Sequence, residues 1–206
     1  MTNGRKMEAR DKFTLGLELP TDPRWINIAE KNIRDILIDH AYCEQKAASS
    51  CISLIVTYPE MPKLVDMLTQ IVAEEWSHFE RVLKELKKRG FTLGPQRRDE
   101  YVEKLSRFTR KGNSRSYQVM ERLLMNALIE ARSCERFKIL WKNIGDKDLS
   151  KFYYELMISE AGHYRNFLQL AKEYVPEDIV ATRWKELLEE EAEIVKGLEV
   201  RGDRMH

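Results

Sequence analysis

The chain carries one short pattern twice, Glu75-Trp76-Ser77-His78 and Glu160-Ala161-Gly162-His163, each within a stretch of helical periodicity. In an α-helix, residues i and i+3 lie on one face, so each pattern directs a carboxylate and an imidazole the same way. A further glutamate precedes each pattern at nearly equal distance: Glu44 lies 31 positions before Glu75, and Glu130 lies 30 positions before Glu160. The sequence therefore holds one unit in duplicate, a Glu followed by a Glu-x-x-His.

A helix-breaking stretch lies near the middle of each unit, at residues 58–62 in the first and 145–147 in the second. Each unit thus predicts an antiparallel helix hairpin. An arm of about 15 residues spans about 22 Å, so the two patches of one hairpin reach the same height. Pairing the hairpins is expected to bring six side chains together: Glu44, Glu75, His78, Glu130, Glu160 and His163.

The apolar residues around these positions test this prediction, because an inward side chain should fall in the same stripe as the core. Glu130 belongs to an otherwise apolar series made of Met120, Leu123, Ala127, Cys134, Phe137 and Trp141. Glu135 instead shares its helix face with Arg132 and Lys138. We therefore assign Glu130, and not Glu135, to the cluster.

Buried carboxylates predict a bound cation, because an unpaired carboxylate in an apolar core costs several kcal/mol or takes up a proton. Four carboxylates and two histidines suit a pair of iron or manganese ions, as in ferritin-like carboxylate bundles. A single Glu-x-x-His on a charged helix is usually a solvated surface. Two copies on apolar seams, each with an upstream Glu, favour the metal site.

Composition describes a water-soluble helical protein: of 206 residues, 43% are hydrophobic and 33% charged, and the net charge is +1. The three cysteines, Cys43, Cys51 and Cys134, have no framework spacing, which favours reduced thiols. No apolar run approaches the length of a membrane span, and residues 1–21 contain no hydrophobic signal region. We expect a cytoplasmic protein without a membrane segment.

The predicted fold is all-α: a ferritin-like four-helix bundle of two antiparallel hairpins with a long basic crossover, plus a C-terminal fifth helix. We expect one domain over residues 1–206. It comprises a polar tail (1–21), the bundle (22–174, crossover 90–116) and a C-terminal helix and tail (175–206). Asp22 and Asp148 are predicted to cap the first and fourth helices, and Asp99 a short crossover helix. The acidic run 189–193 is interpreted as a solvated face.

Residues 87–115 concentrate positive charge, with three acidic side chains (Asp99, Glu100, Glu103) against ten basic ones. The basic side chains are Lys87, Lys88, Arg89, Arg97, Arg98, Lys104, Arg107, Arg110, Lys111 and Arg115. Such a cluster is often only a solvated surface. Beside a predicted active site, and interleaved with aromatic residues, it also suits an RNA backbone and an extruded base.

Five stretches resemble the ferritin-like di-iron tRNA hydroxylases of the MiaE type, which act on 2-methylthio-isopentenyladenosine. They are LPTDPRW (19–25), DHAYCEQKAA (39–48), EEWSHF (74–79), IEARSCERF (129–137) and SEAGHY (159–164). The Glu-x-x-His patterns fit any ferritin-like protein, whereas the second and fourth stretches are much more specific. Beyond about residue 175 no motif matches.

The resemblance implies two iron ions held by Glu44, Glu75, His78, Glu130, Glu160 and His163, with O2 and an external electron donor as co-substrates. It implies hydroxylation of the isopentenyl group of the modified adenosine next to the anticodon of tRNA, with an unidentified electron-donor protein as a second partner. Glu74 and His40 are candidates for orienting the metal ligands. The alternatives are a rubrerythrin-like peroxidase or iron-handling protein, and a helical RNA-binding protein without metal.

Overall fold

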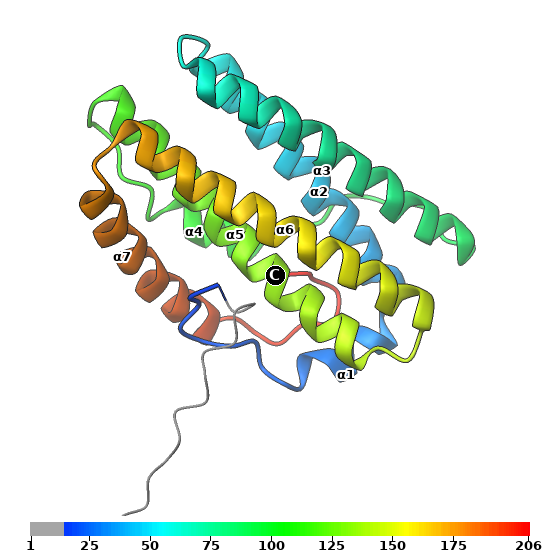
Figure 1. Cartoon of the computed structure of the whole chain (residues 1–206). Coiled ribbons are helices and arrows are strands. Elements are labelled where there is room, and N and C mark those ends of the chain that lie inside the picture. The colour runs from blue at the N-terminus through cyan, green and yellow to red at the C-terminus, as the bar shows by residue number, and fades with distance from the viewer. Residues whose placement is uncertain (1–14) are drawn as a thin grey trace, which may run out of the picture.

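The computed structural model describes residues 15–206, and in this range the chain forms helices and no strands. The helices are α1 (Trp25–Lys31), α2 (Ile33–Thr57), α3 (Pro62–Lys88), α4 (Glu100–Ser106), α5 (Arg115–Asn143), α6 (Lys147–Tyr174) and α7 (Glu177–Lys196). The closest packing is within the pairs α2/α3 and α5/α6, the two antiparallel hairpins of Figure 1. The predicted all-α bundle of two hairpins is confirmed.

Two helix starts differ from the prediction. The first helix begins at Trp25 and is interrupted at Asn32, whose side-chain amide donates to the carbonyl of Ile28. Asp22 does not cap it; its carboxylate accepts from the backbone and side chain of Arg24. The N-terminal cap of α6 is Asp146, not Asp148. Asp146 Oδ1 accepts hydrogen bonds from the backbone N–H groups of Asp148 and Leu149, which have no partner within the helix.

The hydrophobic core consists of two clusters, and each bundle helix passes from one to the other. Cluster one includes Cys51, Leu54, Leu64, Leu68, Ile71, Leu123, Ala127 and Phe167. Cluster two includes Leu37, Ala41, Val82, Cys134, Phe137, Tyr153 and Leu156. On each of the four bundle helices the predicted site residues lie where the helix passes from one cluster to the other. The polar residues therefore form a layer across the middle of the core.

The crossover between the hairpins contains α4, which is capped as predicted by Asp99 accepting from the backbone N–H of Val102. Its apolar side chains Tyr101 and Leu105 are buried. Helix α7 then packs against α4, α5 and α6 (Figure 1). The crossover and α7 together cover the outer side of the second hairpin.

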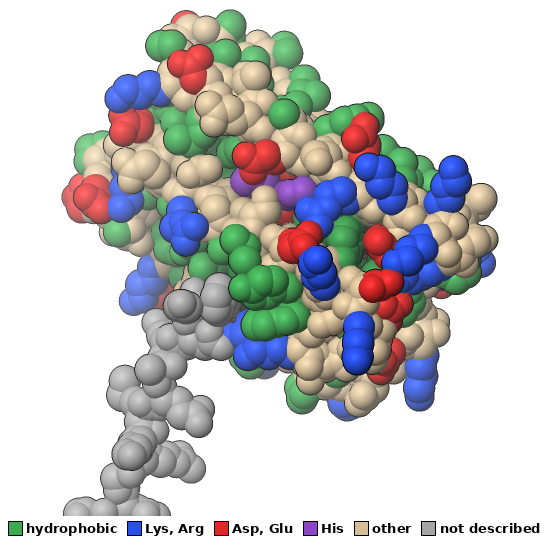
Figure 2. Space-filling view, turned by 45° about the vertical axis from the view of Figure 1, so that its right-hand side comes forward, with side chains coloured by type: hydrophobic (Ala, Val, Ile, Leu, Met, Phe, Trp, Pro, Cys, Tyr) green, Lys and Arg blue, Asp and Glu red, His purple; other side chains and the backbone are tan. Residues whose placement is uncertain are grey.

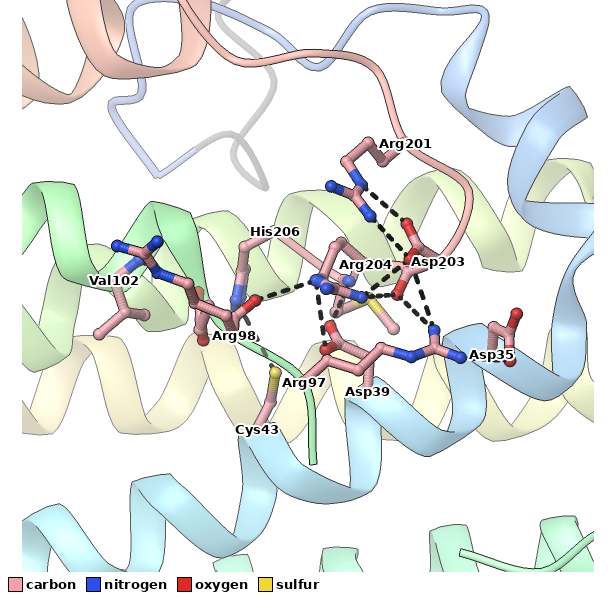
Figure 3. A network of polar contacts seen from close by, with 12 residues as sticks. Asp35, Asp39, Cys43, Arg97, Arg98, Val102, Arg201, Asp203, Arg204 and His206 are labelled. Atoms are coloured by element: carbon pink, nitrogen blue, oxygen red, sulfur yellow. Dashed lines mark hydrogen bonds and ion pairs between the residues drawn. The ribbon is translucent and has the colours of Figure 1, made fainter. Parts of the chain in front are cut away.

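After α7 the chain returns across the bundle, in a segment that the sequence did not explain (Figure 3). Met205 is fully buried, and its backbone N–H donates to Asp39 Oδ2 at 2.7 Å. Gly202 is required for this path, because a Cβ there would lie 2.3 Å from Cγ2 and 2.8 Å from the carbonyl oxygen of Ile28. The segment thereby places His206 between α2, α4 and α5.

Candidate metal centre

The six predicted side chains meet in the polar layer, and all are buried: Glu44, Glu75, His78, Glu130, Glu160 and His163. They form two overlapping groups able to hold a metal ion. The first contains Glu44 and His78, the second contains Glu130 and His163, and both contain Glu75 and Glu160. Within each group one ligand atom per residue lies within 4.8 Å of all the others. The two groups therefore have two carboxylates in common, those of Glu75 and Glu160.

Both imidazoles present Nδ1 to the carboxylates. His78 Nδ1 lies 3.2 Å from Glu160 Oε1 and 3.4 Å from Glu44 Oε2. His163 Nδ1 lies 2.7 Å from Glu75 Oε1 and 3.1 Å from Glu160 Oε2. Nevertheless Glu75 Oε1, Glu160 Oε1 and His78 Nδ1 are buried without a hydrogen bond. Oxygen and nitrogen atoms of this kind can coordinate a metal ion, and their convergence without hydrogen-bond partners fits a site built around cations.

The ionisation of the cluster reflects crowded negative charge. Burial, followed by repulsion from Glu160 and Glu75, raises the pKa of Glu130 well above its usual range. Burial, followed by repulsion from Glu160, also raises the pKa of Glu75 to about 7. Burial opposes protonation of His78, but contacts with Glu160 and Glu44 outweigh it and raise its pKa to about 12. The metal-free cluster therefore retains protons that a bound cation would displace.

Two neighbours orient these residues. His163 Nε2 lies 2.8 Å from Glu74 Oε2, a contact that leaves Nδ1 facing the cluster. His40 Nε2 lies 2.6 Å from Glu44 Oε1. Burial lowers the pKa of His40 to about 3, so a neutral imidazole donates to this carboxylate.

Histidine side chains reach the surface on one face, close to acidic and basic groups (Figure 2).

Glu135 lies outside the cluster, in a buried network of its own. Its carboxylate accepts from Arg132 Nη1 at 2.6 Å and from the backbone N–H of Thr21 at 2.8 Å. The other side of Arg132 donates to both oxygens of Glu191, which is fully buried on α7. The interpretation of run 189–193 as a solvated face is therefore wrong for Glu191, because α7 packs this position against an arginine of α5.

A cavity of about 490 Å³ connects the cluster with the surface. Glu130 forms part of its wall, together with apolar side chains such as Val102, Ile129 and Phe167. Lys46, Lys111 and Arg122 add positive charge to the same wall. The cavity, which the sequence did not reveal, gives a mainly apolar group a route to the site.

Fewer basic side chains of the crossover are unpaired than its sequence indicated. Most of its cations pair with carboxylates: Lys88, Arg89, Arg97, Arg98, Arg110 and Arg115. Within the described part of the chain, Lys87, Lys104, Arg107 and Lys111 have no such pair. Much of the predicted charge excess is therefore paired within the chain, and only these four side chains of the crossover lack a carboxylate partner.

Comparisons with known proteins agree with this geometry. A family model described as "tRNA-(MS[2]IO[6]A)-hydroxylase (MiaE)" matches residues 7–206. A tRNA 2-(methylsulfanyl)-N(6)-isopentenyladenosine(37) hydroxylase of Pseudomonas putida is 39% identical over 80% of this chain and 79% of its own length. A Salmonella typhimurium protein of the same name is 28% identical over 80% of this chain and 78% of its own.

The fold comparison adds a structure from Synechococcus, "Protein 43 with aldehyde deformylating oxygenase activity". It superposes with a TM-score of 0.87 and 34% identity over 92% of this chain and 94% of its own. None of the described helices combines the length and apolar character needed to span a bilayer. With the family model matching nearly the whole chain, this protein belongs to the MiaE family of tRNA hydroxylases.

Proposed function

We propose that this chain is a di-iron, O2-dependent monooxygenase that hydroxylates the isopentenyl group of 2-methylthio-isopentenyladenosine in tRNA, next to the anticodon. The single observation that carries the proposal is the pair of overlapping buried groups with two shared carboxylates. The names of the relatives supply the substrate class. An external electron-donor protein completes the proposed set of partners.

The donor set fits two ions. Glu44 and His78 would hold one ion, Glu130 and His163 the other, and Glu75 and Glu160 would bridge them. Four carboxylates neutralise two divalent cations, and oxygen with imidazole ligands is typical of non-haem iron. Two bound iron ions would supply the reduction of O2 and the insertion of one oxygen atom into a C–H bond.

The protein's own residues perform the remaining tasks. The apolar wall of the cavity that ends at Glu130 suits an isopentenyl group, and it keeps water away from the reacting carbon. Lys111 and Arg122 on that wall suit the phosphates that flank a modified base. Glu74 and His40 hold His163 and Glu44 in orientation.

The first test is metal content followed by turnover. Purified protein, reconstituted anaerobically with ferrous iron, is expected to hold about two irons per chain by elemental analysis. Incubation with isopentenylated tRNA, O2 and a chemical reductant should convert the modified nucleoside to a product heavier by one oxygen atom. Nucleoside mass spectrometry detects that product directly.

Two controls decide between this function and its alternatives. A long-chain aldehyde tests the activity named for the Synechococcus structure, and hydrogen peroxide with a reductant tests a rubrerythrin-like peroxidase. We expect neither to be turned over at a rate comparable with tRNA. Absence of bound iron after reconstitution, or turnover of the aldehyde with tRNA left unchanged, would overturn the proposal.

A further inference from the structure

A second cavity, of about 650 Å³, lies between α1, α4 and the segment that follows α7. Two side chains on its wall have donor groups without acceptors: Trp25, which is buried, and Arg136, which is half-buried. The guanidinium carbon of Arg136 lies 4.3 Å from the centre of the Trp25 ring. Trp25 Nε1, Arg136 Nε and Arg136 Nη1 all lack a hydrogen-bond partner. Three such donors on two stacked groups are unusual in a folded protein.

The neighbouring charges compensate the charge of Arg136 only in part. Arg132, one turn earlier on α5, is already bound to Glu135 and Glu191. Burial, followed by repulsion from Arg132, lowers the pKa of Arg136 to about 10. Water could accept from these N–H groups, but only an anion would also balance the charge.

The acidic side chains on the wall do not provide that anion. Asp22 is bound to Arg24, and Asp99 is bound to Lys46. Glu100 and Glu199 are exposed to solvent. Among the described residues, none of these carboxylates pairs with Arg136.

We propose that this cavity binds a phosphate group, held by the guanidinium of Arg136 and the indole N–H of Trp25. A planar guanidinium with several parallel donors matches the geometry of a phosphate. The cavity shares Asp99 and His206 with the one that reaches Glu130, so the two are adjacent. A phosphate bound here lies beside the proposed entrance for a modified base. This location favours a phosphodiester of the RNA substrate over a free anion, an assignment of source that rests on the proposed function.

His206 lines both cavities and forms part of the wall between them. Its ring lies 5.1 Å from that of Tyr101, and its Nε2 lies 2.8 Å from Ser133 Oγ. The ion pairs of Figure 3 anchor the preceding residues: Asp203 contacts Arg97 and Arg204, and Arg97 also contacts Asp35. The wall between the cavities is therefore fixed by the fold.

The test uses isothermal titration of the full-length, iron-loaded protein with inorganic phosphate at constant ionic strength. Arg136→Gln is expected to weaken phosphate binding about tenfold or more, since it removes a charged hydrogen bond. Trp25→Phe keeps an aromatic ring and loses the indole N–H donor, so about a threefold weakening is expected. Arg24→Gln is the matched control, because Arg24 lines the same cavity but is paired with Asp22. It should bind phosphate as the wild type does.

A second titration, with an unmodified anticodon stem-loop RNA, identifies the source of the phosphate. If phosphate competes with the RNA for the protein, and Arg136→Gln binds the RNA more weakly than the wild type, the site binds a phosphodiester. Phosphate binding that leaves RNA affinity unchanged assigns it to a free phosphate. Wild-type protein that binds no phosphate, or a Trp25→Phe variant that is folded and unimpaired, would overturn the site. These titrations involve no turnover, so failure of hydroxylation would leave their result intact.

Discussion

Helix α5 contributes to two buried clusters of charge that are balanced in different ways. On one side, Glu130 faces Glu75 and Glu160, and no described lysine or arginine pairs with these carboxylates. On another side, Glu135 faces Arg132, which also binds Glu191. Both glutamates are 5% exposed, so burial does not distinguish them. They differ in their counter-charge: Glu135 is paired with an arginine, and Glu130 is not.

The difference shows how a helical bundle divides structural and functional charge. Arginine carries its own positive charge and fixed donors, and it completes the network between α5 and α7 whatever the solution contains. The cluster with Glu130 holds only anionic groups and imidazoles, and its unsatisfied atoms face one another. It becomes balanced only when protons or metal ions enter. A carboxylate network without arginine inside a bundle is thus the more informative sign of function.

The largest effect is expected from exchanging the two glutamates for alanine. Glu130→Ala removes a ligand of one group, and we expect loss of at least one iron and a fall in hydroxylation of about 100-fold or more. Glu135→Ala should retain both irons. It should lower the free energy of unfolding by about 3 kcal/mol, because Arg132 and Thr21 lose their shared acceptor.

Elemental analysis and urea unfolding of both variants check this pair of outcomes. The apo form of Glu130→Ala is expected to lose less stability than Glu135→Ala, because no buried arginine loses its acceptor when Glu130 is removed. Iron retained in Glu130→Ala and lost in Glu135→Ala would reverse our assignment of the site.

The same comparison explains how far the sequence could be read. Both Glu-x-x-His patterns and the seams that contain them are local and periodic, so the hairpins and the meeting of six side chains could be predicted. The second partner of Arg132 could not be predicted, because Glu191 lies on another helix and nothing in the run 189–193 marks one glutamate as buried. The two cavities depend equally on long-range packing, including the return of Met205 and His206.

A smaller effect is expected from neutralising a shared carboxylate in the metal-free protein. The pKa of Glu75 is raised to about 7, so between its unfolded value and pH 7 the folded chain holds a proton that the unfolded chain has released. Stability contributed by this group is therefore present at low pH and lost as pH rises. Metal-free Glu75→Gln should be more stable than metal-free wild type by about 1–3 kcal/mol near pH 8, with little difference near pH 4.

Urea unfolding in the presence of a chelator, repeated across that pH range, measures the difference. Adding ferrous iron should reverse the order near neutral pH, because only the wild type gains stability from binding the metal. A variant less stable than the wild type under every condition would show that Glu75 serves the fold and not a cation.

The smallest effect is expected at the edge of the cluster, where Glu74 accepts from His163 although its side chain is 56% exposed. Glu74→Ala should weaken iron binding by about tenfold and change the free energy of unfolding by less than about 0.5 kcal/mol, since solvent can replace the lost acceptor. Glu80→Ala removes another exposed carboxylate from α3, away from the histidines, and is expected to leave iron binding unchanged. Competition with a chelator of known affinity measures both. Equal iron affinity in the two variants would mean that the surrounding core alone orients His163, and that the contrast between the two charge clusters ends at the six buried residues.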